Sequence, residues 1–210
     1  HIEPLNQMSW LDPEIVLTGE IIQMLPLSQT HFPSLKSIAA DKKIWQFYVF
    51  DGSEPGKFEK VLESALEEKV NKNQYPFTII LRSSGKVVGS TRLMNIQPEH
   101  RKIEIGFTWF HPDYWGSAVN IESKLLLLTY CFEKLTAVRV QFRTDENNIR
   151  SRKAIEKIGG KFEGVIRNDM LRENGTRRNS AYYSIIEDEW KEIKKMLQTK
   201  LEDFLARSES

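Results

Sequence analysis

The chain has 210 residues, of which 40% are hydrophobic and 28% are charged, and its 30 basic residues nearly balance its 29 acidic ones. This composition excludes a disordered or collagen-like chain. The formal net charge of +1 excludes a global field that would draw the chain onto nucleic acid or an anionic membrane. Because no apolar run approaches the roughly 18 residues of a membrane span, we expect a globular domain with a substantial core and no contact with a membrane.

The N-terminus and the cysteine count add two expectations. The chain begins with His1 and Met8 offers a more natural start, so we expect residues 1–7 to be a vector remnant and 8–210 to form one domain. The single cysteine, Cys131, excludes an internal disulfide, and its place in an apolar run predicts a small core residue rather than a nucleophile. A reducing cytoplasm is the expected location.

The first third of the chain predicts a strand and two helices. Residues 15–25 mix β-branched residues with polar breaks between two prolines, which predicts one strand with a bend near Gly19. Apolar residues recur at helical spacing over 29–40 and over 57–72, which predicts two helices. The connecting segment 41–56 is rich in aromatic residues, which either roof a binding cleft or pack on the core.

Three strand-like runs follow at 76–82, 86–96 and 102–110, and the tight turn Ser83–Gly85 joins the first two. Gly106, within the third run, indicates a bulge or a close approach of another group to the backbone. These runs predict an antiparallel meander.

The rest of the chain alternates helices and strands. The pattern predicts a helix over 119–134, a strand over 137–144, a helix over 151–158, a hairpin of 161–173 and 176–186 that turns at Asn174-Gly175, and a C-terminal helix over about 187–207. A helix separates the strand at 102–110 from the strand at 137–144, so the two can pair in parallel through a right-handed crossover. We therefore expect an α/β (α+β) domain with a mixed, mainly antiparallel central sheet flanked by helices. The long C-terminal helix is a candidate surface for a homodimer.

The turn at 113–118 carries the first chemical signal. It leads from a strand directly into a long helix, whose first N–H groups lack intrahelical acceptors and can bind a phosphate. The helix dipole supplies only about 0.3–1 kcal/mol to an anion, so useful affinity requires several converging donors. Taken alone, such a turn is more often a structural connection than a phosphate site.

The order of these motifs resembles the GNAT superfamily of acyl-CoA-dependent N-acetyltransferases, and most of all its branch of ribosomal-protein N-terminal acetyltransferases. After the turn and its helix, the next strand ends in Thr144-Asp145, and Asn147-Asn148 precedes a helix that stops at Gly159-Gly160. The resemblance extends over residues 15–190. It implies a single GNAT-like domain that moves an acetyl group from acetyl-CoA to a primary amine of unknown identity, either a protein N-terminus or a small-molecule amine.

The resemblance also implies which residues bind the donor. Backbone groups of one strand would pair with the pantetheine arm of CoA, the turn and the start of its helix would cradle the pyrophosphate, and two residues of the next helix would bind near the thiol. In this sequence these residues are, in that order, Phe107, Thr108, Trp109 and Phe110; Gly116, Ser117, Ala118, Val119 and Asn120; and Asn148 and Ser151.

The sequence departs from the family pattern at three positions. Asp113 and Ala118 stand where the family usually has an Arg or Gln and a second Gly, and an aspartate is electrostatically unfavourable beside a pyrophosphate. Ile155 stands where many members place a tyrosine that acts as a general acid, so that acid is absent here.

Glu104 is the candidate general base for the acceptor amine, acting through water, because a carboxylate in mid-strand beside a glycine is unusual in an apolar run. The alternative is a structural ion pair with Lys102 or Arg92 on neighbouring positions. His111, next to the turn, is a second candidate base, and Ser151 either assists at the thiol or caps its helix.

Other functions have weaker support. Four scattered histidines and one cysteine do not make a metal site. The same fold could serve as a non-catalytic acyl-CoA-binding or sensing module. The chain could also be a ribosome or nucleic-acid adaptor that uses a basic hairpin, although we do not expect nucleic acid as a partner because most such clusters are solvated faces; the arginines concerned are Arg167, Arg172, Arg177 and Arg178.

Overall fold

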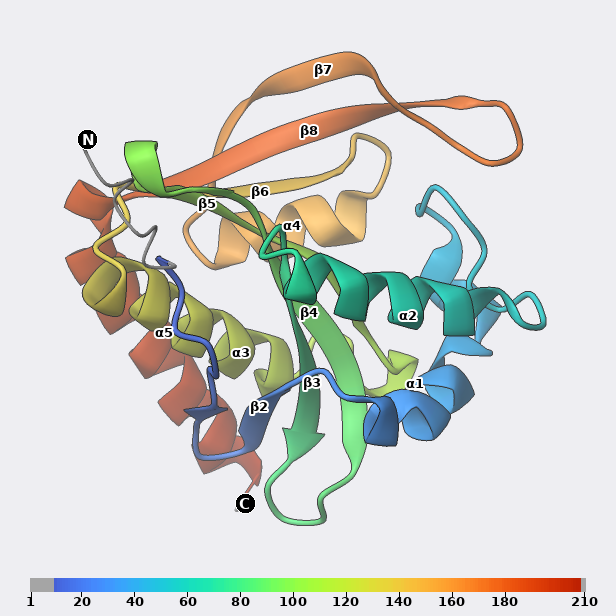
Figure 1. Cartoon of the computed structure of the whole chain (residues 1–210). Coiled ribbons are helices and arrows are strands. Elements are labelled where there is room, and N and C mark those ends of the chain that lie inside the picture. Colours follow the sequence, from blue (N-terminus) through green and yellow to red (C-terminus); the bar gives the residue numbers. More distant parts are fainter. Residues whose placement is uncertain (1–9, 209–210) are drawn as a thin grey trace, which may run out of the picture.

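The computed structural model describes residues 10–208, and the expected remnant at 1–7 lies outside them. The described residues form one eight-stranded sheet with the strand order β1-β2-β3-β4-β5-β6-β8-β7, flanked by α-helices (Figure 1). The pairs are antiparallel except for β5 with β6, which are parallel. The predicted α/β (α+β) class with a mixed, mainly antiparallel sheet is therefore confirmed.

The strands and helices lie close to their predicted positions. The strands are β1 (Leu17–Thr18), β2 (Ile22–Pro26), β3 (Tyr75–Leu81), β4 (Val87–Gln97), β5 (Lys102–Phe110), β6 (Arg139–Asp145), β7 (Lys161–Leu171) and β8 (Arg177–Ile186). The α-helices are α1 (Phe32–Ala39), α2 (Lys57–Val70), α3 (Ala118–Thr129), α4 (Ile149–Lys157) and α5 (Glu187–Ser208).

The prediction of one bent strand over 15–25 is wrong, because the chain reverses there and β1 pairs with β2 as a hairpin. The carboxylate of Glu122 on α3 holds this turn by accepting the backbone N–H groups of Glu20, Ile21 and Ile22 at 2.6, 2.9 and 2.8 Å. Gly19 is required beside it, since a Cβ on this residue would lie 2.3 Å from the carboxyl carbon of Glu122.

Two hydrophobic clusters hold the layers together. One lies between the sheet and α3, α4 and α5, with Phe77 and Leu127 fully buried within it. The other lies between α1, α2 and the sheet, where Trp45 packs on Trp109 with ring centroids 5.6 Å apart. The aromatic segment 41–56 therefore contributes to the core, and it also reaches the cleft described below.

The C-terminal helix α5 lies beside α3 (Figure 1). Its apolar stripe, which includes Trp190, Leu197 and Leu201, is buried within the chain. This stripe therefore packs within the chain's own core, and the homodimer through α5 stays a prediction. Among the described residues, no helix is long and apolar enough to cross a membrane.

The pairing of β5 with β6 is short, and this shapes the centre of the molecule. Lys102–Glu104 of β5 pair with Arg139–Gln141 of β6, and the registered pairing ends there. On its other side, β5 pairs with β4 across a register shift. Phe107, with φ of 47°, lies at this irregularity, as the neighbouring Gly106 predicted. Residues 105–110, the C-terminal part of β5, consequently have a free backbone edge on the side toward β6.

We expect the substitution Glu122→Gln to lower the free energy of unfolding by about 2–4 kcal/mol. The glutamine amide has no negative charge, and its NH2 group would face the backbone N–H donors that the carboxylate accepts. Urea unfolding measures this change. The matched control is Glu63→Gln on the exposed face of α2, which should stay within about 0.5 kcal/mol of the unchanged protein. Equal stability of the two variants would contradict the role assigned to Glu122.

Cys131 is fully buried, and burial raises the pKa of its thiol. We expect iodoacetamide to leave it unmodified in the folded protein and to modify it after unfolding, because the thiolate is the reactive form. Cys131→Ala should cost about 1 kcal/mol of stability through the small cavity that it leaves. Rapid alkylation of the folded chain, followed by mass spectrometry, would instead identify a reactive thiol.

Candidate active site

A cleft of about 200 Å³ lies where β5 and β6 part. Its walls come from the free part of β5, from the end of β6, from α3 and α4 near their first turns, from the segment that joins α1 to α2, and from β8. Elements far apart in the sequence thus meet at the point where the sheet opens.

Backbone groups of β5 form one wall. Thr108 and Trp109 line the cleft, and Tyr48 donates its hydroxyl to the carbonyl oxygen of Thr108 at 2.6 Å. The ring of Phe107 packs on Phe50 away from this cleft and lines a second hollow beside α2. Phe110 lines the cleft and accepts the indole N–H of Trp115 at its carbonyl oxygen.

The turn into α3 also lines the cleft. Gly116 has φ of 70°, and a Cβ on it would meet no atom within 4 Å, so the space beside this backbone is open. Gly116 and Asn120 line the cleft, and Ser117 caps α3 by accepting the N–H of Val119 at 3.2 Å. The side chain of Val119 is buried in the core.

The remaining residues of the turn do not line the cleft. Ser117, Ala118 and Val119 can contribute only backbone groups to a ligand there. Asp113, expected to be unfavourable for a pyrophosphate, has a side chain that is 78% exposed and lies outside the cleft lining. The unfavourable charge is therefore turned into solvent.

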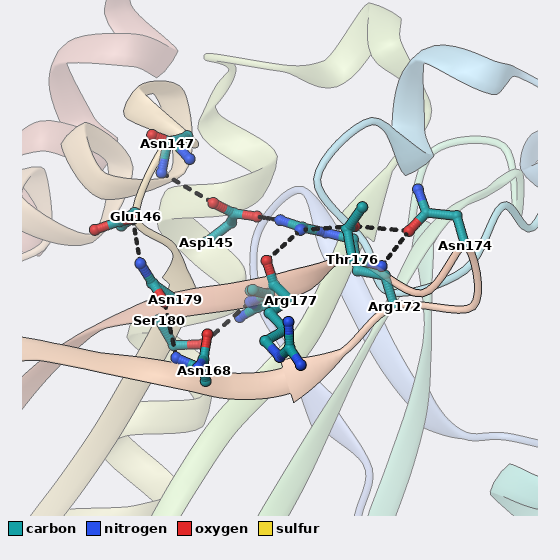
Figure 2. Close-up of polar contacts among 11 residues, drawn as sticks. Asp145, Glu146, Asn147, Asn168, Arg172, Asn174, Thr176, Arg177, Asn179 and Ser180 are labelled. Atoms are coloured by element: carbon teal, nitrogen blue, oxygen red, sulfur yellow. Dashed lines mark hydrogen bonds and ion pairs between the residues drawn. The ribbon is translucent and has the colours of Figure 1, made fainter.

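Asn148 and Ser151 lie together in the cleft wall at the start of α4. Asn148 caps the helix, because its side-chain oxygen accepts the N–H of Ser151 at 3.1 Å. Asp145, at the end of β6, accepts the N–H of Asn147 and pairs with Arg172 of the hairpin (Figure 2). This buried carboxylate fixes the start of α4 and therefore the direction of its cap.

Glu104 is 1% exposed and does not belong to the cleft lining. Its Oε1 lies 3.0 Å from Nε of Arg143, without an aligned hydrogen bond, and Asn95 donates to its Oε2. The expected structural partners Lys102 and Arg92 are wrong: Glu104 faces Gln141 across the parallel pair, and Arg143 is two residues further along the same face.

Burial raises the pKa of the Glu104 carboxyl, and Arg143 and Asn95 partly offset this effect. Arg143 itself lines the cleft and also contacts Asp169 at 3.4 Å. Of this ion pair, only Arg143 lines the cleft.

His111, the second candidate base, lies at the end of β5 outside the cleft lining. Its Nδ1 accepts the N–H of Asp113 at 3.2 Å, and its ring packs edge-on against Tyr114. The structure does not bring it to Glu104 or Ser151, so the three candidate catalytic residues do not form one cluster.

The sequence reasoning missed the charged side chains that line the cleft. Lys124, Arg143, Arg150 and Arg178 line it, and among the described residues no aspartate or glutamate does. Lys124 is 6% exposed and donates to Oγ1 of Thr108 at 3.1 Å, and burial lowers its pKa to about 7. The guanidinium carbon of Arg150 lies 3.5 Å from the ring centroid of Trp115.

A signal for Lys124 was present in the sequence. It precedes Leu127, Leu128 and Cys131 by three, four and seven residues, which places it on the buried stripe of α3. A lysine on such a stripe is rare unless a polar environment receives it. Arg150 and Arg178 carry no comparable pattern, because each lies in a polar stretch.

The basic hairpin does not present all its arginines as a free surface. Arg172 pairs with Asp145 and donates to the carbonyl oxygen of Arg177, as Figure 2 shows. Arg178 lines the cleft, and the N–H of Glu173 binds the carbonyl oxygen of Val49 at 2.9 Å. The hairpin is therefore a wall of the cleft.

The polar groups that line the cleft are backbone groups, hydroxyls, the side-chain amides of Asn120 and Asn148, and cations. Such groups suit a ligand with amide and phosphate groups. Residues 10–208 contain no group of three or more His, Cys, Asp or Glu side chains that could hold a metal ion.

Comparisons with known proteins agree with this geometry. Residues 22–161 match the acetyltransferase (GNAT) domain family. The relative named "Putative ribosomal N-acetyltransferase YdaF", from Bacillus subtilis, is 35% identical over 106 residues, which are 50% of this chain and 57% of YdaF. The N-acetyltransferase YnaD of the same organism is 30% identical over 125 residues, covering 58% of this chain and 72% of YnaD.

Solved structures extend the likeness across the fold. A GCN5-related N-acetyltransferase from Brucella melitensis has a TM-score of 0.83 at 27% identity, covering 89% of this chain and 85% of that one. An acetyltransferase from T. thermophilus has a TM-score of 0.80 at 32% identity, covering 91% and 99%. The chain therefore belongs to the GNAT family of acetyltransferases.

Proposed function

We propose that this enzyme transfers an acetyl group from acetyl-CoA to a primary amine, and that the amine is the N-terminus of a protein. The observation that carries the donor assignment is the free edge of β5, which runs beside the open turn at Gly116 in a cleft that cations line. An extended arm with amide groups can pair with such an edge, and phosphates can bind at the helix N-terminus above it.

The residues present fit coenzyme A. The space beside Gly116 leaves room for a pyrophosphate, and the N-terminus of α3 favours its negative charge. Arg150 lies over Trp115 next to this turn, where its guanidinium group can reach a phosphate. Asn148 and Ser151 face the same cleft from α4 and would lie along the arm. Bound acetyl-CoA supplies the thioester that carries the acetyl group.

In this proposal β5 orients the acyl group, and its backbone N–H groups near Phe107 to Phe110 polarise the thioester carbonyl. Glu104 takes up the proton of the acceptor amine through a water molecule. Its Oε1 accepts no aligned hydrogen bond from the described residues and can accept one from this water. Arg143, which pairs with this carboxylate and lines the cleft, keeps the water path oriented.

Two observations favour a protein N-terminus as the acceptor. The relative YdaF is named a ribosomal N-acetyltransferase. The charges that line the cleft are all positive among the described residues, and such a wall repels a polyamine but admits an α-amine, whose pKa near 8 leaves part of it neutral. The spermidine N-acetyltransferase of Vibrio cholerae, solved with CoA and spermine, is only 15% identical at a TM-score of 0.67 and shares the fold alone.

We place the reaction in the cytoplasm, where the buried and unpaired Cys131 stays reduced.

The experiment that tests the proposed function is an acceptor screen with acetyl-CoA and a readout of free thiol. Peptides with free N-termini should release thiol faster than spermine or an aminoglycoside. If none of the amines releases thiol, the result would support the alternative of a non-catalytic acyl-CoA-binding module.

Gly116→Asp should weaken CoA binding at least tenfold in calorimetry without unfolding the protein. The aspartate adds a negative charge where we place the pyrophosphate, and the positive φ of this residue adds backbone strain. Gly175→Asp is the matched control, because Gly175 also has a positive φ and open space but lies at the tip of the hairpin. Unchanged CoA affinity in Gly116→Asp would remove the turn from the donor site.

Glu104→Gln should reduce the rate by about 10²–10⁴-fold with CoA affinity preserved, which is the usual contribution of a general base. The acidic limb of the pH–rate profile should also disappear, because the wild-type rate falls as the carboxylate gains its proton. If Glu104 instead acts by holding Arg143, the variant and Arg143→Met should lose similar rates while the acidic limb persists. That outcome would shift the base to His111 or to solvent.

A further inference from the structure

The amine of Lys124 lies in the wall of the cleft at the level of the β5 bulge. The side chain extends from α3, and its Nζ donates to Oγ1 of Thr108 at 3.1 Å, one residue beyond Phe107. Thr108 Oγ1 lies 2.8 Å from Oγ1 of Thr91, so a second hydroxyl holds the threonine that receives the amine. Because the donor arm is proposed to run down β5 from the Gly116 turn, this position is at the acyl end of the arm.

Lys124 has no acidic partner in this wall. The charged or titratable groups that line the cleft with it are Tyr48 from the α1–α2 segment, Tyr114 from the turn before α3, Arg143 from β6, Arg150 from α4 and Arg178 from β8. None of them is a carboxylate, and desolvation is the cause that lowers the Lys124 pKa to about 7. A leucine or methionine would fill the same stripe of α3 without this desolvation cost, so packing does not account for a lysine here.

We propose that Lys124 is the catalytic acid that gives a proton to the sulfur of CoA as the thioester breaks. The inference rests on the proposed function, because it needs acetyl-CoA in this cleft. Ile155 lines the same cleft, and its side chain has no proton to give. The amine of Lys124 reaches this cleft from α3.

The step balances in atoms and charge. The acceptor nitrogen forms a bond to the acyl carbon, the carbon–sulfur bond breaks with its electron pair on sulfur, and Nζ transfers one proton to that sulfur. The acceptor nitrogen loses one proton through water to Glu104, which releases it to solvent, and Nζ regains one from solvent. Amine and acetyl-CoA thus become amide and CoA thiol, and the protein returns to its starting state.

A depressed pKa suits this role. An ordinary lysine at about 10.4 holds its proton too tightly to give it to a thiolate near 8.5. Because the acid must be protonated, the rate should fall as pH rises through the Lys124 pKa. The phosphates of bound CoA add negative charge and place this fall above the value of about 7 to which burial lowers the Lys124 pKa.

The first test needs no acceptor. Calorimetry compares CoA with desulfo-CoA, which lacks the sulfur atom, on wild-type protein, Lys124→Met and the control Lys153→Met on the exposed face of α4. We expect wild-type and Lys153→Met to bind CoA roughly tenfold more tightly than desulfo-CoA, as a hydrogen bond to a charged group gives. The ratio should fall to about one in Lys124→Met. An equal ratio in all three proteins would overturn the inference.

The second test uses the best acceptor peptide from the thiol-release screen. Lys124→Met and Lys124→Arg should both lose about 10²-fold or more in kcat and the basic limb of the pH profile, because neither side chain donates a proton near neutral pH. Full activity in Lys124→Arg would show that only the positive charge matters and would overturn the acid role. Should Lys124→Met unfold, Lys124→Gln carries the same comparisons.

The inference and the proposed function fail in different ways. A wild-type protein that binds neither CoA nor desulfo-CoA would refute the acetyl-CoA donor, and the inference with it. A protein that binds CoA and acetylates no amine would refute the transfer reaction and the acid role with it, while the calorimetric ratio would still decide whether Lys124 contacts the sulfur.

Discussion

The short parallel pairing of β5 with β6 is the constraint on which the site depends. The two strands share three residue pairs, and the registered pairing ends at Glu104 and Gln141. β6 stays in the sheet because β8 pairs along its other edge, while β5 follows β4 through the irregularity at Phe107. A sheet that stayed closed here would satisfy its own backbone groups and leave no edge for a ligand.

Local signals were enough to predict most of the fold. Hydrophobic periodicity and the turns at Ser83–Gly85 and Asn174-Gly175 depend on neighbouring residues, and the elements that they predicted are confirmed. The hairpin of β1 and β2 was missed because its turn is held by Glu122, a residue 100 to 102 positions away. A contact over that distance leaves no mark on local sequence pattern.

The candidate site was predicted less completely for a similar reason. Thr108, Gly116, Asn148 and Ser151 were found through the family resemblance, and they do line one cleft. The partner of Glu104 depends on the register of a parallel pair, which the sequence does not reveal. The positive lining of the cleft joins side chains from α3, β6, α4 and β8, so it becomes visible only when these elements are assembled.

The contact between Glu122 and the first hairpin also bears on how the protein folds. A loop of about a hundred residues must close before the carboxylate reaches its three N–H donors, and closing such a loop is entropically unfavourable. Since α3 carries Glu122 and also begins at the turn beside Gly116, this contact ties the turn to the first hairpin. We therefore expect the turn beside Gly116 and the N-terminal edge of the sheet, which this helix joins, to unfold together.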